Sequence, residues 1–142
     1  MRTLIVFSTK SGASRECSEM LAERIGGCDI CDLGERTPNI TEYDMVIAGS
    51  GIRMGGAYKQ FKKFLKDNAF SLLQKRAAYF ICNKETENSP KYIEKNIPED
   101  LRRVAVSIRT FGGKAPFGKG KGQSWMLIEE VNAFVSEVKG TT

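Results

Sequence analysis

Five short apolar runs alternate along this chain with segments whose apolar residues recur at helical spacing. The runs are residues 3–7, 28–33, 44–50, 77–83 and 104–111. Most of them are apolar enough to be covered on both faces, which is typical of strands in a parallel sheet. Because strands and helices alternate, the sequence predicts an α/β fold of three layers, a doubly wound five-stranded parallel sheet with helices on both faces.

Glycine, serine and proline mark the expected helix boundaries. The first helix, which contains Cys17 and Leu21, should end at Gly26 and Gly27. We expect Ser89 to be the N-cap of a later helix, with Pro90 at its first position. A basic helix should follow the third strand, with its aromatic residues inward; the residues on that side are Tyr58, Phe61, Phe64, Leu65 and Asn68. A final helix should begin near Ser124 and bury Leu127, Ile128, Val131, Phe134, Val135 and Val138.

The length of 142 residues predicts one domain, residues 1–142. No apolar run reaches the roughly 18 residues that a membrane span needs. The first residues enter a strand-like run without the pattern of a signal peptide. We therefore expect a cytoplasmic protein.

The residues that are absent restrict the chemistry. The chain has no histidine, so the Ser/His and Cys/His nucleophile systems and most transition-metal sites are excluded. Among the four cysteines only Cys28 and Cys31 have a suggestive spacing, but a strand would hold them about 10 Å apart, too far for a disulfide. We therefore expect plain thiols and no metal site, and any reactivity should come from a bound cofactor.

Positive charge gathers in one segment of the chain. The net charge is +5, and residues 101–122 contain six basic residues and no acidic one. The segment is either a solvated face or a docking surface for an anionic substrate, an acidic partner or a membrane surface. The loop 112–122 is the candidate for contact with a membrane. Nucleic acid is the weaker option because no recognition motif with interleaved aromatic residues is present.

The loop after the first strand has the features of an anion site. It reads STKSGAS and joins the strand directly to a helix, where unpaired backbone N–H groups and the helix dipole favour negative charge. Gly12 lets the backbone curl closely around a guest. The other residues of the loop, most of which add hydroxyl donors, are Ser8, Thr9, Lys10, Ser11, Ala13 and Ser14. A phosphate would fit here, although the Walker and dinucleotide-binding glycine patterns are absent.

In this loop the chain resembles the flavodoxins. Their phosphate loop also follows an apolar strand that ends in an aromatic residue, here Phe7, and it has the same spacing of hydroxyl and small residues. Ser14 stands where the family usually has its last threonine. The resemblance implies the strand order 2-1-3-4-5, counting only the five predicted strands, and FMN as the cofactor.

Two further loops fit the same resemblance. The segment GSGIRMGG after the third strand, followed by a basic helix, is similar to the flavodoxin-like protoporphyrinogen oxidases, and CNKET follows the fourth strand. The resemblance implies that one loop lies on each side of the isoalloxazine ring: Ser50, Gly51, Ile52, Arg53, Met54 and Gly55 on one side, and Asn83, Lys84 and Glu85 on the other. Neither loop has an aromatic residue at its tip, so Ile52, Met54 and Arg53 would stack on the isoalloxazine ring. Tyr58 and Trp125 are expected in the core or at helix starts.

Three function classes remain open on the sequence. The first is an FMN oxidoreductase of the protoporphyrinogen oxidase type that acts on an anionic or quinone-like aromatic substrate, although the long insertion of those enzymes is absent here. The second is a flavodoxin-type electron carrier that docks on a redox partner protein, with Arg102, Arg103, Lys114, Lys119 and Lys121 as its contact surface. The third is a flavodoxin-shaped binding module without flavin. No side chain stands out as a catalytic acid or base.

Overall fold

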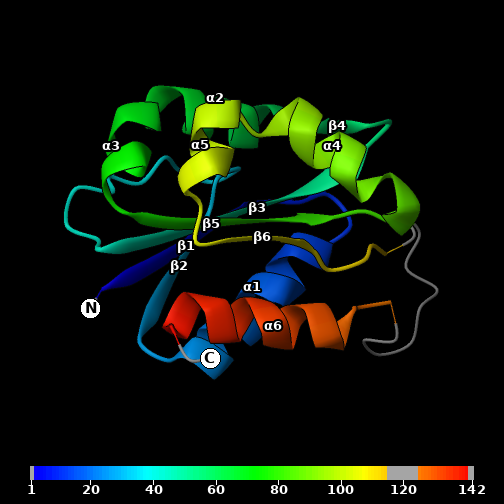
Figure 1. The fold of residues 1–142 in the computed structure, drawn as a ribbon, viewed down its shortest axis with the longest axis horizontal. Helices are drawn as coiled ribbons and strands as arrows, with labels where there is room; N and C mark the ends of the chain where they lie inside the picture. Colours follow the sequence, from blue (N-terminus) through cyan, green and yellow to red (C-terminus); the bar gives the residue numbers. More distant parts are fainter. Residues whose placement is uncertain (1, 115–124, 141–142) are drawn as a thin grey trace.

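The computed structural model describes residues 2–114 and 125–140. Its sheet contains the five predicted parallel strands in the order β2-β1-β3-β5-β6, which confirms the predicted topology (Figure 1). The strands are β1 (Thr3–Ser8), β2 (Cys28–Asp32), β3 (Met45–Arg53), β5 (Arg76–Cys82) and β6 (Ser107–Thr110). A short strand that was not predicted, β4 (Gly56–Ala57), folds back antiparallel on the end of β3.

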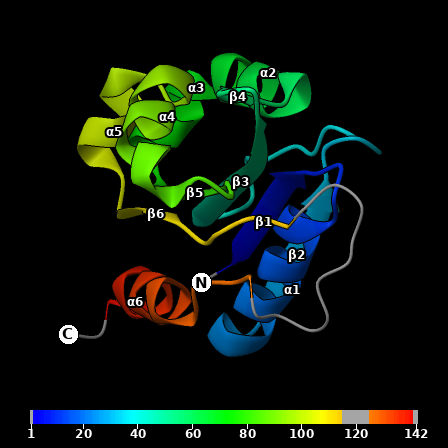
Figure 2. The same cartoon turned by 90° about the vertical axis from the view of Figure 1, so that its right-hand side faces the viewer.

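Helices cover both faces of the sheet, as predicted. Helices α1 (Ala13–Ile25) and α6 (Ile128–Lys139) lie on one face, and the other helices lie on the opposite face (Figure 2). That second group consists of α2 (Lys59–Asp67), α3 (Ala69–Gln74), α4 (Ser89–Asn96) and α5 (Glu99–Val104), with the short 3₁₀ turn η1 (Thr86–Asn88) before α4. The fold is therefore the three-layer α/β arrangement.

Alternation along the strands divides the core in two. In β1, Leu4 and Val6 pack under the α2–α5 layer, whereas Ile5 packs under α1 and α6. Side chains of a strand point alternately to opposite faces, so both faces of a central strand must be apolar. The α1/α6 half contains an aromatic group in which Phe80 stacks on Phe111 at 5.0 Å and meets Phe134 edge-on at 6.2 Å.

Several predicted boundaries are wrong by a few residues. Ser89 is the first residue of α4, and Asn88 is its N-cap. The fifth predicted strand begins later, because Val104 belongs to the unpredicted helix α5. The last helix begins at Ile128 rather than near Ser124, which lies outside the described residues. Leu127 donates its N–H to the carbonyl oxygen of Phe111, which ties its backbone to the end of β6, and its side chain and that of Ile128 stay partly exposed.

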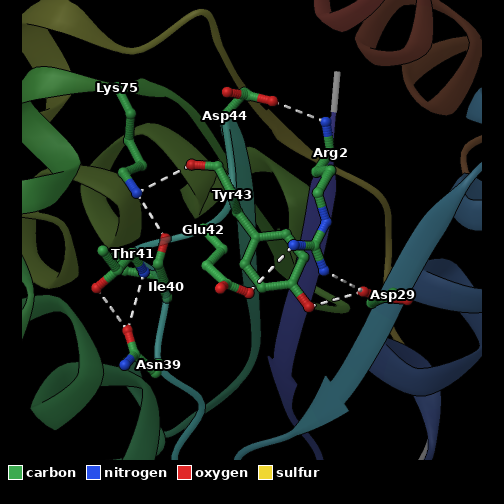
Figure 3. Close-up of polar contacts among 9 residues, drawn as sticks. All are labelled: Arg2, Asp29, Asn39, Ile40, Thr41, Glu42, Tyr43, Asp44 and Lys75. Carbon is green, nitrogen blue, oxygen red and sulfur yellow. Dashed lines mark hydrogen bonds and ion pairs between the residues drawn. The ribbon is translucent and has the colours of Figure 1, made fainter.

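Polar contacts hold the loop between β2 and β3 at the amino edge of the sheet (Figure 3). Lys75 Nζ donates to the carbonyl oxygens of Ile40 and Tyr43 at 2.6 and 3.0 Å. The Tyr43 hydroxyl donates to Asp29 at 2.7 Å, and the guanidinium of Arg2 lies over the Tyr43 ring. These groups close the edge where the strands begin, which leaves the opposite edge for a ligand.

Candidate functional site

A cavity of about 520 Å³ lies at the carboxyl edge of the sheet. Four loops surround it, those that follow β1, β3, β5 and β6. In doubly wound sheets the carboxyl ends of the strands are the usual ligand-binding edge. The residues that line it are Lys10, Ser11, Ala13, Gly51, Ile52, Arg53, Met54, Tyr58, Cys82, Lys84, Gly113 and Lys114.

The loop after β1 is closed by its own side chains. The N–H of Gly12 donates to Thr9 Oγ1 at 2.9 Å, and the N–H of Ala13 donates to Ser11 Oγ at 3.3 Å. Gly12 has a φ of +91°, a conformation that glycine adopts without cost, and it precedes the first turn of α1. The loop therefore brings the positive end of the α1 dipole to the cavity.

Two buried hydroxyls beside this loop have no hydrogen-bond partner among the described residues. They are Ser8 Oγ and Ser14 Oγ, at the end of β1 and in the first turn of α1. An unpaired buried hydroxyl costs about 1 to 3 kcal/mol, so such groups are normally satisfied by a protein group, an ordered water or a ligand. A phosphoryl oxygen is an acceptor that both hydroxyls could use, and the residues present fit a phosphorylated ligand at this loop.

The loop after β3 is a tight hairpin that leads into β4. Met54 and Gly55 both have positive φ, +54° and +80°, which is the pattern of a type I′ turn. Ser50 Oγ accepts the N–H of Tyr58 at 3.2 Å and donates to the carbonyl oxygen of Gly51 at 2.8 Å. Met54 lies at the tip of the turn, where it lines the cavity and is 95% exposed.

The loop after β5 is organised by one amide. Asn83 Nδ2 donates to the carbonyl oxygen of Glu85 at 2.7 Å, while its Oδ1 accepts the hydroxyls of Ser89 and Thr110 at 3.1 and 2.7 Å. The loop after β6 lies directly against it, since a Cβ on Gly113 would come within 2.7 Å of the backbone nitrogen of Lys84. Gly113 therefore lets these two loops meet at the cavity.

The cavity wall is basic. Four cations line it, Lys10, Arg53, Lys84 and Lys114, and no acidic side chain of the described residues does. Lys10 Nζ lies 5.4 Å from the centre of the Tyr58 ring, and Lys114 forms an ion pair with Glu16 of α1. Burial raises the pKa of the Tyr58 phenol, with Arg53 acting in the opposite direction, so the ring is neutral at physiological pH.

Half of the residues predicted for the site line the cavity. These are Lys10, Ser11, Ala13, Gly51, Ile52, Arg53, Met54 and Lys84. The other half lie in the same loops but outside the wall: Ser8, Thr9, Gly12, Ser14, Ser50, Gly55, Asn83 and Glu85. Several of these, such as Thr9, Ser50 and Asn83, hold their loops in shape through the hydrogen bonds described above.

Four lining residues were not predicted. Tyr58 is the N-cap residue of α2, as the helix-start expectation has it, but its ring also faces the cavity. Gly113 and Lys114 follow the fifth predicted strand, and the rule that every strand end reaches this edge could have found them. For Cys82 the sequence has no signal beyond its place at the end of a strand.

The basic segment 101–122 does not form one surface among its described residues. Arg102 and Arg103 lie on α5, which precedes the amino end of β6, whereas Lys114 follows its carboxyl end. Arg109 is bound to Glu130 and Glu137 of α6. Lys119 and Lys121, and most of the loop 112–122 proposed for membrane contact, lie outside the described residues.

The structure also describes the cysteines and the lengths of the helices. Cys28 and Cys31 lie on strand β2, as predicted, and all four cysteines are free thiols. Among residues 2–114 and 125–140, no helix is long and apolar enough to cross a membrane.

Solved structures that are similar to this chain include flavodoxins and related flavoproteins. Oxidised flavodoxin 2 from Bacillus cereus superposes with a TM-score of 0.66 at 15% identity and covers 99% of both chains. A flavoprotein from Lactobacillus acidophilus NCFM, solved in complex with FMN, has a TM-score of 0.58 at 15% identity over 77% of this chain and 92% of that chain. At these identities the likeness shows the shared fold.

Sequence comparison adds a relative and a family. The chain is 32% identical over 88 residues to protoporphyrinogen IX dehydrogenase (quinone) of Escherichia coli K12, a match that covers 58% of this chain and 49% of that protein. The match thus spans about half the length of this relative. A family model described as a flavodoxin domain matches residues 4–117. This chain therefore belongs to the flavodoxin domain family.

Proposed function

We propose that this protein binds FMN at the carboxyl edge of its sheet and uses it as an oxidoreductase. The observation that carries the proposal is the combination of two unsatisfied buried hydroxyls, Ser8 and Ser14, with a basic cavity that other residues of the same loop line. The phosphoryl group would be held by the N–H groups and hydroxyls of residues 8–14. FMN-containing structures share this fold, which supports the same cofactor here.

The chain itself would perform binding and positioning. When bound, FMN supplies the reversible transfer of electrons. Ile52, Met54 and Tyr58 offer apolar contact to a flat ring, and the hydrogen bonds of Ser50 fix the hairpin that carries the first two. Asn83 fixes the loop on the other side in the same manner. Because these contacts exist in the chain alone, the site is preorganised for a planar ligand.

The substrate class follows from the charge of the cavity. Lys114 is paired with Glu16, but Lys10, Arg53 and Lys84 have no ion-pair partner among the described residues. These three charges favour an anionic aromatic substrate or a quinone that becomes negatively charged on reduction. The name of the Escherichia coli relative indicates dehydrogenation of protoporphyrinogen IX with a quinone as acceptor, and protoporphyrinogen carries carboxylates. We therefore infer a reaction of the protoporphyrinogen dehydrogenase type, for which bound FMN would supply the electron exchange between a reduced porphyrin-like substrate and a quinone.

A second candidate function is electron transfer to a protein. A shallow groove of about 570 Å³ runs along α2 and is lined by Ala57, Lys59, Lys62, Lys63, Lys66 and Asp67. Four lysines on one face of α2, the helix whose N-cap Tyr58 lines the cavity, would suit an acidic redox partner. In that case FMN would exchange electrons with the partner and not with a small substrate.

Titration with FMN, followed by turnover, tests the proposal. We expect the purified chain to bind FMN more tightly than riboflavin, and to oxidise protoporphyrinogen with a quinone acceptor once FMN is bound. Arg53→Gln and Lys84→Gln should each raise the KM for the porphyrin roughly fivefold, the equivalent of about 1 kcal/mol for an exposed charge. Lys91→Gln, on the exposed face of α4, is the matched control.

Three results would redirect the proposal. Binding without turnover, combined with rapid reduction of the bound flavin by a flavodoxin reductase, favours the electron carrier. Equal affinity for FMN and riboflavin refutes the phosphate site. A folded chain that takes up neither flavin is a binding module of another kind.

A further inference from the structure

We propose that Cys17 and Cys82 form a reversible disulfide, so that the floor of the cavity is a site of thiol oxidation. The two sulfur atoms lie 3.7 Å apart, within hydrogen-bond distance of each other. Both side chains are buried, but Cys82 also lines the cavity. Nothing in the proposed FMN function uses this pair of thiols.

The two cysteines come from elements that the fold brings together. Cys17 lies in the second turn of α1, the helix that follows the loop after β1, and Cys82 is the last residue of β5. Both belong to the α1/α6 half of the core, because Cys82 continues the alternation set by Ala78 and Phe80. A disulfide requires the sulfur atoms to approach to about 2.05 Å, so the pair must close by less than about 2 Å.

The other two cysteines provide an internal comparison. Cys28 and Cys31 are on strand β2, and their thiols donate to separate backbone carbonyls, at distances of 3.7 to 3.8 Å. Strand geometry keeps them about 10 Å apart. Oxidation within one chain should therefore select the pair Cys17 and Cys82.

The cavity admits a small oxidant to one of the two sulfurs. With hydrogen peroxide, the Cys82 sulfur attacks one oxygen, the O–O bond breaks, and a sulfenic acid and one water form. The Cys17 sulfur then attacks the Cys82 sulfur, the S–O bond breaks, and the departing hydroxide takes the Cys17 proton to give a second water. In total the two thiols lose two electrons and two protons, and one peroxide becomes two waters.

The order of the two steps follows from accessibility and from acidity. Only Cys82 faces the cavity, so it is the sulfur that meets the oxidant. The pKa of the Cys17 thiol is raised, first by its hydrogen bond with Cys82 and then by burial. Because the thiolate is the reactive form, Cys17 suits the second, intramolecular step.

Peptide mapping of the intact chain tests the inference, and it needs no flavin. The folded protein is exposed to hydrogen peroxide, blocked with N-ethylmaleimide and digested with trypsin. The cysteines then fall in three peptides: residues 16–24 hold Cys17, residues 77–84 hold Cys82, and residues 25–36 hold both Cys28 and Cys31. We expect a linked peptide pair of 16–24 and 77–84, about 2 Da lighter than the sum of the two, which dithiothreitol separates.

Two variants follow the intermediate and keep the test falsifiable. In Cys17→Ser the sulfenic acid on Cys82 cannot be resolved, so dimedone should label residues 77–84; in Cys82→Ser it should not label residues 16–24. The double variant Cys28→Ser, Cys31→Ser should form the link as the native chain does.

Several outcomes would overturn the inference. They are complete N-ethylmaleimide labelling of all four cysteines after peroxide, a link that appears only in urea, and a link between two chains. Because the link is scored in the chain without added flavin, a failure of FMN binding leaves the result of this test unaffected.

Discussion

Ser14→Ala should change FMN affinity and the stability of the flavin-free protein in opposite directions. In the chain alone the Ser14 hydroxyl is fully buried and has no partner among the described residues. Removing it, and placing alanine in the first turn of α1, should stabilise the flavin-free protein by about 0.5 to 1 kcal/mol. With FMN bound, the same change removes a hydrogen bond to a charged phosphoryl group, which contributes about 1.5 to 3 kcal/mol. The expected loss of FMN affinity is therefore about 10- to 150-fold.

Ser18→Ala is the matched control for this change. Ser18 is also in α1, fully buried and without a partner among the described residues, but it lies one turn farther from the loop. It should give the same gain in stability without a change in FMN affinity. Calorimetric titration with FMN and riboflavin, together with thermal unfolding of the flavin-free proteins, measures both effects.

The reasoning fails on either of two results. One is that Ser14→Ala binds FMN as tightly as the native chain. The other is that its affinity for riboflavin falls as much as that for FMN, since riboflavin lacks the phosphate and should be insensitive to this hydroxyl.

Three further predictions concern what holds the site in place. Gly49→Ala should cost about 1 to 3 kcal/mol in urea unfolding, because its Cβ would lie 2.0 Å from the Phe80 ring; native-like stability would contradict this contact. Lys75→Met should lower the free energy of unfolding by about 1 to 2 kcal/mol through two lost hydrogen bonds, measured against the exposed control Lys66→Met. The hydrogen bond from Arg109 lowers the pKa of Glu137, so this carboxylate stabilises the fold above its unfolded pKa and the contribution is lost as the pH falls below about 4. Glu137→Gln should therefore be slightly less stable than the native chain at pH 7, by under about 1 kcal/mol, because the Glu137 side chain is 42% exposed and solvent screens the pair. The variant should also lose less stability than the native chain when the pH is lowered. Parallel curves of stability against pH would refute the assignment.

The sheet could be predicted from the sequence because its signals are local and redundant. Each central strand is apolar on both faces, as Leu4 and Ile5 illustrate, and the resemblance in the first loop then implied the strand order that the structure has. The errors occur where tertiary contacts override local pattern. Leu127 looks like a buried helix residue, but its N–H pairs with Phe111 at the end of β6, and the helix starts one residue later.

The sequence could predict which loops form the candidate site, but not which of their residues line the cavity. Strand ends locate residues 8–14, 50–55 and 83–85, since each follows an apolar run. Which of their side chains face the cavity depends on side-chain hydrogen bonds, such as those of Asn83, that spacing does not encode. The approach of Gly113 to the loop after β5 is also a contact between segments far apart in the chain.

The charge of the cavity links the choice of substrate to the energetics of the flavin. A positive charge about 8 Å from a negative one, at an effective dielectric constant near 20, stabilises it by roughly 2 kcal/mol. That energy corresponds to on the order of 90 mV for one electron. Arg53 and Lys84 line the cavity from opposite loops, and both would favour the negatively charged reduced flavin as well as an anionic substrate. Acidic residues around the cavity would disfavour both the reduced flavin and an anionic substrate. Under the proposed function, the basic wall therefore favours the exchange of electrons in pairs with a small anion over one-electron transfer at low potential.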